Sequence, residues 1–187
     1  MTPIPLGILA ASGFVEIGAY DLLETQILSS SAALVTFTGL DTLATEYQHL
    51  QLRVTARSPR ASSFGVVRAS FNSESILNSD YGYRQFNANG TSFSHFGATG
   101  SMTINRVPAA TEPAGSFGIF IVDILDATNS SKATTIRTLG GFSGTAPQIN
   151  FYTGSRNTSP LSSMQLTVFG STFDTGSRFS LYGIKGA

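Results

Sequence analysis

Apolar and polar residues alternate along most of this chain, and the alternation is most regular between Leu50 and Arg57. Successive side chains of a β-strand point to opposite faces, so a strand here has one apolar face and one polar face. An α-helix would scatter the same apolar residues around its axis. The polar positions of this strand are Gln51, Arg53, Thr55 and Arg57. We therefore expect a sheet that covers a hydrophobic core with one face and turns the other face to water or to a partner.

The same pattern predicts ten or eleven strands and no helix longer than two turns. The connection over residues 40–47 is expected to hold one helical turn, and Asn89-Gly90 predicts a hairpin turn. Residues 92–100 read as a long flexible stretch, and Gly140-Gly141 is expected to end a strand. The predicted strands are 20–28, 34–38, 50–57, 65–72, 80–86, 101–107, 117–125, 132–139, 148–154, 164–170 and 178–184.

The stretch 117–125 differs from the other predicted strands, because it is apolar at nearly every position. Ile119 and Ile121 lie on one face of such a strand, and Phe120 and Val122 lie on the other. A strand that is apolar on both faces is typical of the interior, with cover on each side. We therefore expect this strand to be buried on both faces.

Strands at short intervals with no helices between them favour antiparallel pairing. The chain has 187 residues, which suits a single sandwich domain. We predict an all-β fold: an antiparallel two-sheet sandwich of jelly-roll type, formed by residues 19–187.

Residues 1–18 are predicted to be an extended N-terminal arm rather than part of that domain. Pro3 and Pro5 prevent a helix there and hold the preceding residues extended. The arm has no basic region of the kind that begins a signal peptide. It is too apolar for a free tail, so we expect it to dock on its own domain or on a neighbouring subunit through Leu6, Ile8, Leu9 and Phe14.

Charge and composition exclude several kinds of site and partner. The chain contains 11 basic and 11 acidic residues, so its formal net charge is zero and it has little electrostatic protection against association. It has no cysteine, which excludes disulfides and thiolate metal sites within the chain. No apolar run approaches the length that spans a membrane, so we expect no membrane partner.

Catalytic and metal-binding patterns are weak throughout the chain. His49 and His95 stand alone, with no second ligand at metal-binding spacing. Asp123 with Asp126, and Glu74 with Asp80, have the residue types of a glycosidase pair or a Ca²⁺ site, but turn chemistry explains Asp126 more simply. We assign no catalytic residue, no cofactor and no metal, and we expect a protein that is not an enzyme.

A group of cations and aromatic residues is the remaining candidate site. Four arginines fall within sixteen positions, and at least three are expected on the polar side of neighbouring strands, close to two tyrosines. Arginine and tyrosine are enriched at subunit interfaces. A plain solvated face and a nucleic-acid surface are the alternatives, and the neutral charge argues against the latter. The candidate interface residues are Arg53, Arg57, Arg60, Arg68, Tyr81 and Tyr83.

Several segments together resemble a family of small β-rich virion proteins encoded by tailed bacteriophages, cyanophages among them. The resemblance covers most of residues 20–185 and is carried by YDLLET at 20–25, YQHLQLR at 47–53, DILD at 123–126 and GSRFSLYGIK at 176–185. These motifs are structural signatures, so no functional residue is transferred from the family. The resemblance implies a structural component of a phage particle, made in the host cytoplasm and located in the virion.

Two functions within that class are open. The first is a capsid decoration or cement protein, expected to be a homo-oligomer and most simply a trimer, whose partners are copies of itself and the major capsid protein or other virion proteins. The second is a tail or fibre-tip protein that binds host-surface glycans on an aromatic platform of Tyr81, Tyr83, Tyr152 and the Phe93–Phe96 segment. A glycan-cleaving enzyme is a third, more distant alternative.

Overall fold

The computed structural model describes residues 20–156 and 159–185, and the predicted arm over 1–18 lies outside the described residues. The described chain forms strands and one short 3₁₀ helix, η1 (Leu40–Thr45), at the position where the sequence predicts a helical turn. No described helix has the length and apolar character needed to cross a membrane. The strands are β1 (Tyr20–Ile27), β2 (Val35–Thr38), β3 (His49–Ala56), β4 (Phe64–Phe71), β5 (Gly82–Asn89), β6 (Ser92–Thr99), β7 (Met102–Pro108), β8 (Gly118–Leu125), β9 (Thr135–Phe142), β10 (Gln148–Ser155), β11 (Ser163–Val168) and β12 (Arg178–Ile184).

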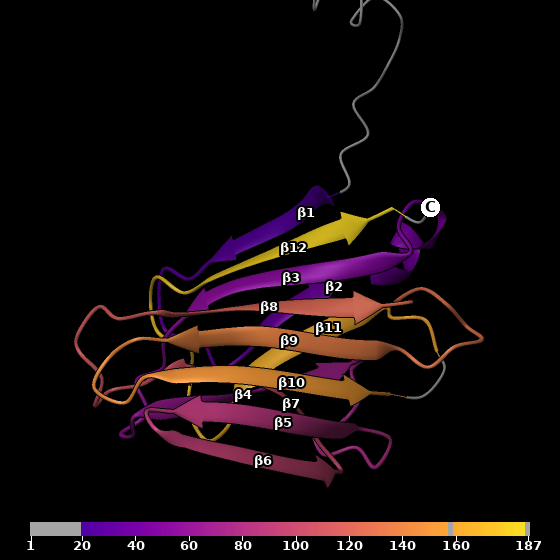
Figure 1. The fold of residues 1–187 in the computed structure, drawn as a ribbon. Coiled ribbons are helices and arrows are strands. Elements are labelled where there is room, and N and C mark those ends of the chain that lie inside the picture. The colour runs from indigo at the N-terminus through magenta and orange to yellow at the C-terminus, as the bar shows by residue number, and fades with distance from the viewer. Residues whose placement is uncertain (1–19, 157–158, 186–187) are drawn as a thin grey trace, which may run out of the picture.

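These strands form two antiparallel sheets that pack against each other, which confirms the predicted all-β sandwich (Figure 1). The large sheet has eight strands in the order β1-β12-β3-β8-β9-β10-β5-β6. The small sheet has four strands in the order β2-β11-β4-β7. The chain crosses between the sheets eight times, from β1 to β2, β2 to β3, β3 to β4, β4 to β5, β6 to β7, β7 to β8, β10 to β11 and β11 to β12.

Two hairpins, β9–β10 and β5–β6, add four strands to the large sheet on the side of β8. β9 and β10 pair with each other, and so do β5 and β6, and the four strands together follow β8 in the sheet order. The small sheet ends at β7, so the large sheet extends past it on this side (Figure 1). This overhang sets the shape of the surfaces described below.

The core lies between the two sheets and is formed by the apolar positions of the strands in which apolar and polar residues alternate. On β3, Leu50, Leu52 and Val54 are buried, whereas Arg53 and Thr55 are exposed, as predicted. The small sheet contributes its own apolar positions to the same cluster, including Val67, Phe71 and Leu166 from β4 and β11. Each sheet therefore has one face in the core and one outer face.

Two local predictions are wrong. Residues 92–99 are not a flexible stretch but the edge strand β6, which pairs with β5 along its whole length after the predicted turn at Asn89-Gly90. β9 does not stop at Gly140-Gly141 but continues to Phe142. Gly140 lies opposite Phe120 on β8, and a Cβ on Gly140 would overlap the Cβ of Phe120 and the carbonyl oxygen of Ile119. The glycine therefore allows close strand approach rather than ending the strand.

The prediction for β8 is also wrong on one face. Phe120, Val122 and Ile124 are buried in the core, as expected. The opposite face of the strand is uncovered, and Ile119 and Ile121 are 65% and 44% exposed. β8 is central in the large sheet, so its backbone is paired on both sides, but no part of the described chain packs over its outer side chains.

Candidate functional site on the outer face of the large sheet

A row of large apolar side chains crosses the outer face of the large sheet. Register places Ile121 on β8 opposite Leu139 on β9, Leu139 opposite Phe151 on β10, and Phe151 opposite Phe86 on β5. All four side chains are substantially exposed. Side chains directly opposite on adjacent strands stand close enough to contact, so these four form a continuous apolar stripe.

A second apolar row lies beside the first. It runs from Ile119 through Gly141 to Ile149, and then through Ala88 to Phe93 on β6. Ile149 and Phe93 are 65% and 71% exposed. The two rows are linked where the rings of Phe86 and Phe93 stack with their centroids 5.7 Å apart. Contiguous exposed apolar surface of this kind marks an interaction site in a globular protein.

The surface is hollowed at the β8–β9 part of these rows. An open groove of about 1020 Å³ is lined there by residues that include Ile119, Ile121, Leu139 and Ile149. Gly141 contributes no side chain between Ile119 and Ile149, which leaves the space between them open. The groove is therefore apolar at its base and is suited to an apolar ligand or segment.

The border of this apolar surface is polar and mainly cationic. Arg137 pairs with Asp123 at 2.8 Å, and Asp123 also accepts a hydrogen bond from the Gln51 amide at 2.8 Å. Arg53 donates to Gln51 at 2.8 Å, and its guanidinium carbon lies 4.4 Å from the ring centroid of Tyr182. An apolar centre with a polar rim is the usual anatomy of a protein–protein interface.

Asp123 and Asp126, the first candidate carboxylate pair, each contact side chains of their own chain. Asp123 is held by Gln51 and Arg137, as described above. Asp126 occupies a turn with a φ of 54°, and its carbonyl oxygen accepts the Asn129 N–H, which confirms the turn interpretation. The Asp126 carboxylate instead contacts the Gln48 amide at 3.1 Å and the Lys132 ammonium at 3.7 Å.

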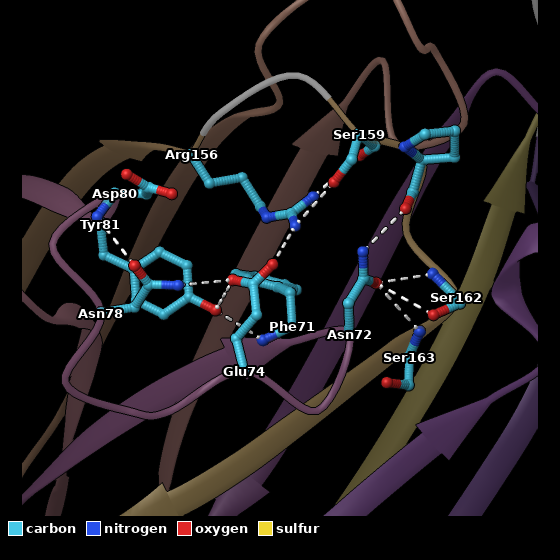
Figure 2. Close-up of polar contacts among 11 residues, drawn as sticks. Phe71, Asn72, Glu74, Asn78, Asp80, Tyr81, Arg156, Ser159, Ser162 and Ser163 are labelled. Atoms are coloured by element: carbon cyan, nitrogen blue, oxygen red, sulfur yellow. Dashed lines mark hydrogen bonds and ion pairs between the residues drawn. The ribbon is translucent and has the colours of Figure 1, made fainter.

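Glu74 belongs to a structural network that Figure 2 shows. Its carboxylate accepts hydrogen bonds from the Tyr81 hydroxyl at 2.7 Å, the Asn78 amide at 3.1 Å and the buried Arg156 guanidinium at 2.6 Å. The Tyr81 hydroxyl in turn accepts the Phe71 N–H at 2.9 Å. The carboxylate thus ties the loop after β4 to the loop after β10. Asp80 joins the network through its N–H, which donates to the Asn78 side-chain oxygen at 2.9 Å, and not as a second carboxylate beside Glu74.

The four predicted arginines do not share one surface, because β3 and β4 belong to different sheets. Arg53 is exposed on the outer face of β3, as expected. Arg57 is buried, and its guanidinium donates to the carbonyl oxygens of Glu112, Pro113 and Ser116. Its assignment to the interface is therefore wrong, since its donors hold a loop of its own chain.

Arg60 and Arg68 lie near the small sheet, where Arg68 stacks on Phe169 at 3.9 Å and Arg60 donates to the Phe169 carbonyl oxygen at 3.3 Å. Tyr81 is buried in the network of Figure 2, so its assignment to the interface is wrong as well. Tyr83 is half-buried. Tyr152 is also buried, so the predicted tyrosines do not form an exposed platform, although Tyr83, Tyr152 and Phe96 line one pocket.

The two histidines lie far apart in the fold. His49 Nδ1 accepts the Asp126 N–H at 2.9 Å, which is a packing role. His95 is exposed on β6, opposite Phe86 at the end of the first apolar row. No cluster of three or more metal-ligating residues occurs among the described residues.

Sequence reasoning missed most of the outer apolar surface, including Leu139, Ile149 and Phe151. The available signal was the apolar character of β8 on both faces, which was interpreted as burial within the chain. The predicted interface residues Leu6, Ile8, Leu9 and Phe14 lie outside the described residues.

Comparison with protein-family models, with curated proteins and with solved structures found no match to this chain.

Proposed function

We propose that this protein is a non-enzymatic structural subunit of a bacteriophage particle, most simply a capsid decoration protein, that works as an assembly of copies. The observation that carries the assembly is the pair of apolar rows on the outer face of the large sheet. Burying one such side chain contributes about 1.5–3 kcal/mol, so covering the rows is strongly favourable. The phage setting rests on the resemblance of residues 20–185 to virion proteins.

The occupant that we assign to the groove is the segment 1–18 of a neighbouring copy. This segment is rich in apolar residues, and Glu16 is its only charged side chain. The groove is bordered by Arg53 and Arg178, which form no ion pair with any described residue. An apolar segment with a single carboxylate therefore complements an apolar groove with a cationic border.

The geometry of β1 favours a neighbour over the segment's own chain. β1 begins at Tyr20 and ends at Ile27. By strand register Ile27 is level with Ile119 in the second apolar row, and Thr25 is level with Ile121 in the first. An arm that docks on its own chain would have to turn back along β1 to reach the groove, whereas an arm from a neighbouring copy need not. Eighteen extended residues span about 60 Å, which is enough to reach an adjacent subunit.

The zero net charge supports the same proposal, because copies of the chain have no overall charge that would drive them apart. The edge strands β1 and β6 add a further reason to associate, since unpaired strand edges are templates for pairing. β6 is exposed along most of its length.

Sedimentation of two forms of the protein tests the assembly. The full chain is expected to sediment as an oligomer, and a form that lacks residues 1–18 is expected to sediment as a folded monomer. A fluorescent label on the shortened form then separates the two docking routes. If the segment acts between copies, the labelled form co-sediments with unlabelled full chain; if it folds back on its own chain, the label stays in the monomer fraction.

An image of the particle whose genome encodes this chain tests the phage setting. Density for the sandwich on the outside of the capsid is expected, and addition of the shortened form to stripped particles is expected to give lower occupancy than the full chain. Density at the tail tip instead would replace decoration by the fibre function. A monodisperse full-length monomer, together with particles that lack the chain, would contradict the whole proposal.

A further inference from the structure

A second pocket, distinct from the apolar groove, lies between the outer face of the small sheet and the inward side of the overhanging β5–β6 hairpin. Its volume is about 490 Å³. It is lined by residues from β4, β5, β6, β7 and β10, and these include Arg60, Arg68, Arg106, Tyr83, Phe96 and Tyr152. A pocket of this size fits a small organic molecule rather than a bare ion.

The charge of this pocket is unbalanced. Three arginines line it, and no aspartate or glutamate does. Nor do these arginines form an ion pair elsewhere in the part of the chain that the structure describes. Arg68 and Arg106 each lie over a ring, with the guanidinium carbon 3.9 Å from the centroid of Phe169 and 4.3 Å from that of Phe64. The rings fix the two guanidinium groups in place without neutralising them.

Buried polar groups in the pocket also lack partners. Tyr152 is 1% exposed, and its hydroxyl makes no hydrogen bond of good geometry among the described residues, although Arg106 lies near enough to lower its pKa. Burial raises the pKa of Tyr152 to about 12, against the opposing effect of Arg106, so the hydroxyl keeps its proton at neutral pH. The Nε–H groups of Arg68 and Arg106 are buried without an acceptor as well. Unpaired buried donors are costly, which indicates that an acceptor normally enters this region.

We propose that this pocket binds a small organic molecule that carries an oxyanion, either a carboxylate or a phosphate. The planar forks of the arginines match either anion. The exposed ring of Phe96, 6.2 Å from that of Tyr83, supplies an apolar wall for the body of the ligand. Because the pocket shares no lining residue with the outer apolar rows, this binding is independent of the assembly proposed above.

Calorimetric titration of the full chain with three matched sugars tests the inference. Glucuronate carries a carboxylate, glucose 6-phosphate carries a phosphate, and glucose is neutral. At least one of the two anionic sugars is expected to bind, with glucose at least tenfold weaker, and the tighter one identifies the anion. Equal binding of glucose, or no binding of either anionic sugar, would overturn the proposal. Inorganic phosphate has no sugar ring. If it binds as tightly as the tighter of the two anionic sugars, the Phe96 ring does not contribute to binding.

Variants connect that binding to this pocket. Arg106→Gln and Arg60→Gln are each expected to weaken binding by about tenfold or more, since each removes a charge-assisted hydrogen bond. Arg84→Gln removes the same charge from the exposed face of β5 and serves as the control. Tyr152→Phe is expected to weaken binding while leaving the melting temperature nearly unchanged, because the hydroxyl makes no hydrogen bond of good geometry to the described residues. Equal losses in Arg60→Gln and Arg84→Gln, with both variants folded, would show nonspecific charge attraction and contradict the site.

Discussion

Leu139 on β9 lies directly opposite Phe151 on β10, and both side chains stand on the outer face of the large sheet, 59% and 39% exposed. Cross-strand pairs of this kind normally stabilise a sheet from within a core. Here the pair joins Ile121 and Phe86 in a row that the described chain leaves uncovered. The chain therefore packs one face of the sheet into its core and presents these apolar rows on the other face.

Leu139→Glu is expected to abolish assembly without unfolding the subunit. The leucine is largely exposed in the single chain, so the change costs little there, but a buried unpaired carboxylate at an interface costs several kcal/mol. Sedimentation velocity measures the oligomer, and circular dichroism measures the fold. Thr135→Glu, at an exposed outer position on the same strand, is the matched control and is expected to leave the oligomer intact. Oligomers of unchanged size in Leu139→Glu would show that this row is not the contact.

Gly140→Ala is expected to destabilise the protein by about 1–3 kcal/mol, the usual cost of overpacking. The added methyl would overlap the Cβ of Phe120 and the backbone of Ile119, and neither can move without shifting β8. Gly82→Ala is the control, because its methyl would meet only ordinary contacts at 3.9 and 4.0 Å. Urea unfolding of both variants measures the difference. Equal stability of the two would show that β8 and β9 relax apart easily.

Tyr81→Phe is expected to lower the free energy of unfolding by about 1–3 kcal/mol. The change removes the donor to Glu74 and leaves the Phe71 N–H buried without its acceptor. Chemical denaturation of the variant measures the loss. Tyr182→Phe, on the outer face of β12, is the control and is expected to be nearly neutral, since its ring still faces Arg53. A neutral Tyr81→Phe would mean that water replaces the hydroxyl, and the network of Figure 2 would then be dispensable.

Stability is expected to fall between about pH 10 and pH 12. Burial raises the pKa of Tyr152 to about 12, above the value of about 10 for an unfolded chain. A raised folded-state pKa means that the stabilisation is complete below pH 10 and is lost as the pH rises through 12, because the unfolded chain releases its proton first. Burial raises the pKa of Tyr81 in the same direction. Urea midpoints across this range measure the loss, which is expected to be smaller in Tyr152→Phe.

Several features follow from local sequence because their causes are local. The alternation in β3 predicts its buried and exposed positions except Gln51, which is buried under its hydrogen bonds to Asp123 and Arg53. The Asn89-Gly90 pair predicts the β5–β6 hairpin turn, and residues 40–47 contain the expected helical turn. The error over 92–99 has a local explanation as well. Its serines and glycines resemble a loop, and pairing with β5 outweighs that weak preference.

The candidate site could not be predicted from local sequence, because it depends on which strands pair in which sheet. Arg53 and Arg68 are close in sequence, but the chain crosses from one sheet to the other between them, so they end on different surfaces. Arg60, Arg68 and Arg106 meet in one pocket only because β4 and β7 pair and the β5–β6 hairpin overhangs them.

The amino-acid sequence by itself determined the fold class, because period-two alternation has one geometric solution: strands with one buried face. It also determined that both faces of β8 carry large apolar side chains. Only the tertiary structure decided what packs against each face of β8. The small sheet covers the inner face, and the described chain supplies nothing for the outer one, because sheet order and overhang arise from pairings between strands far apart in sequence.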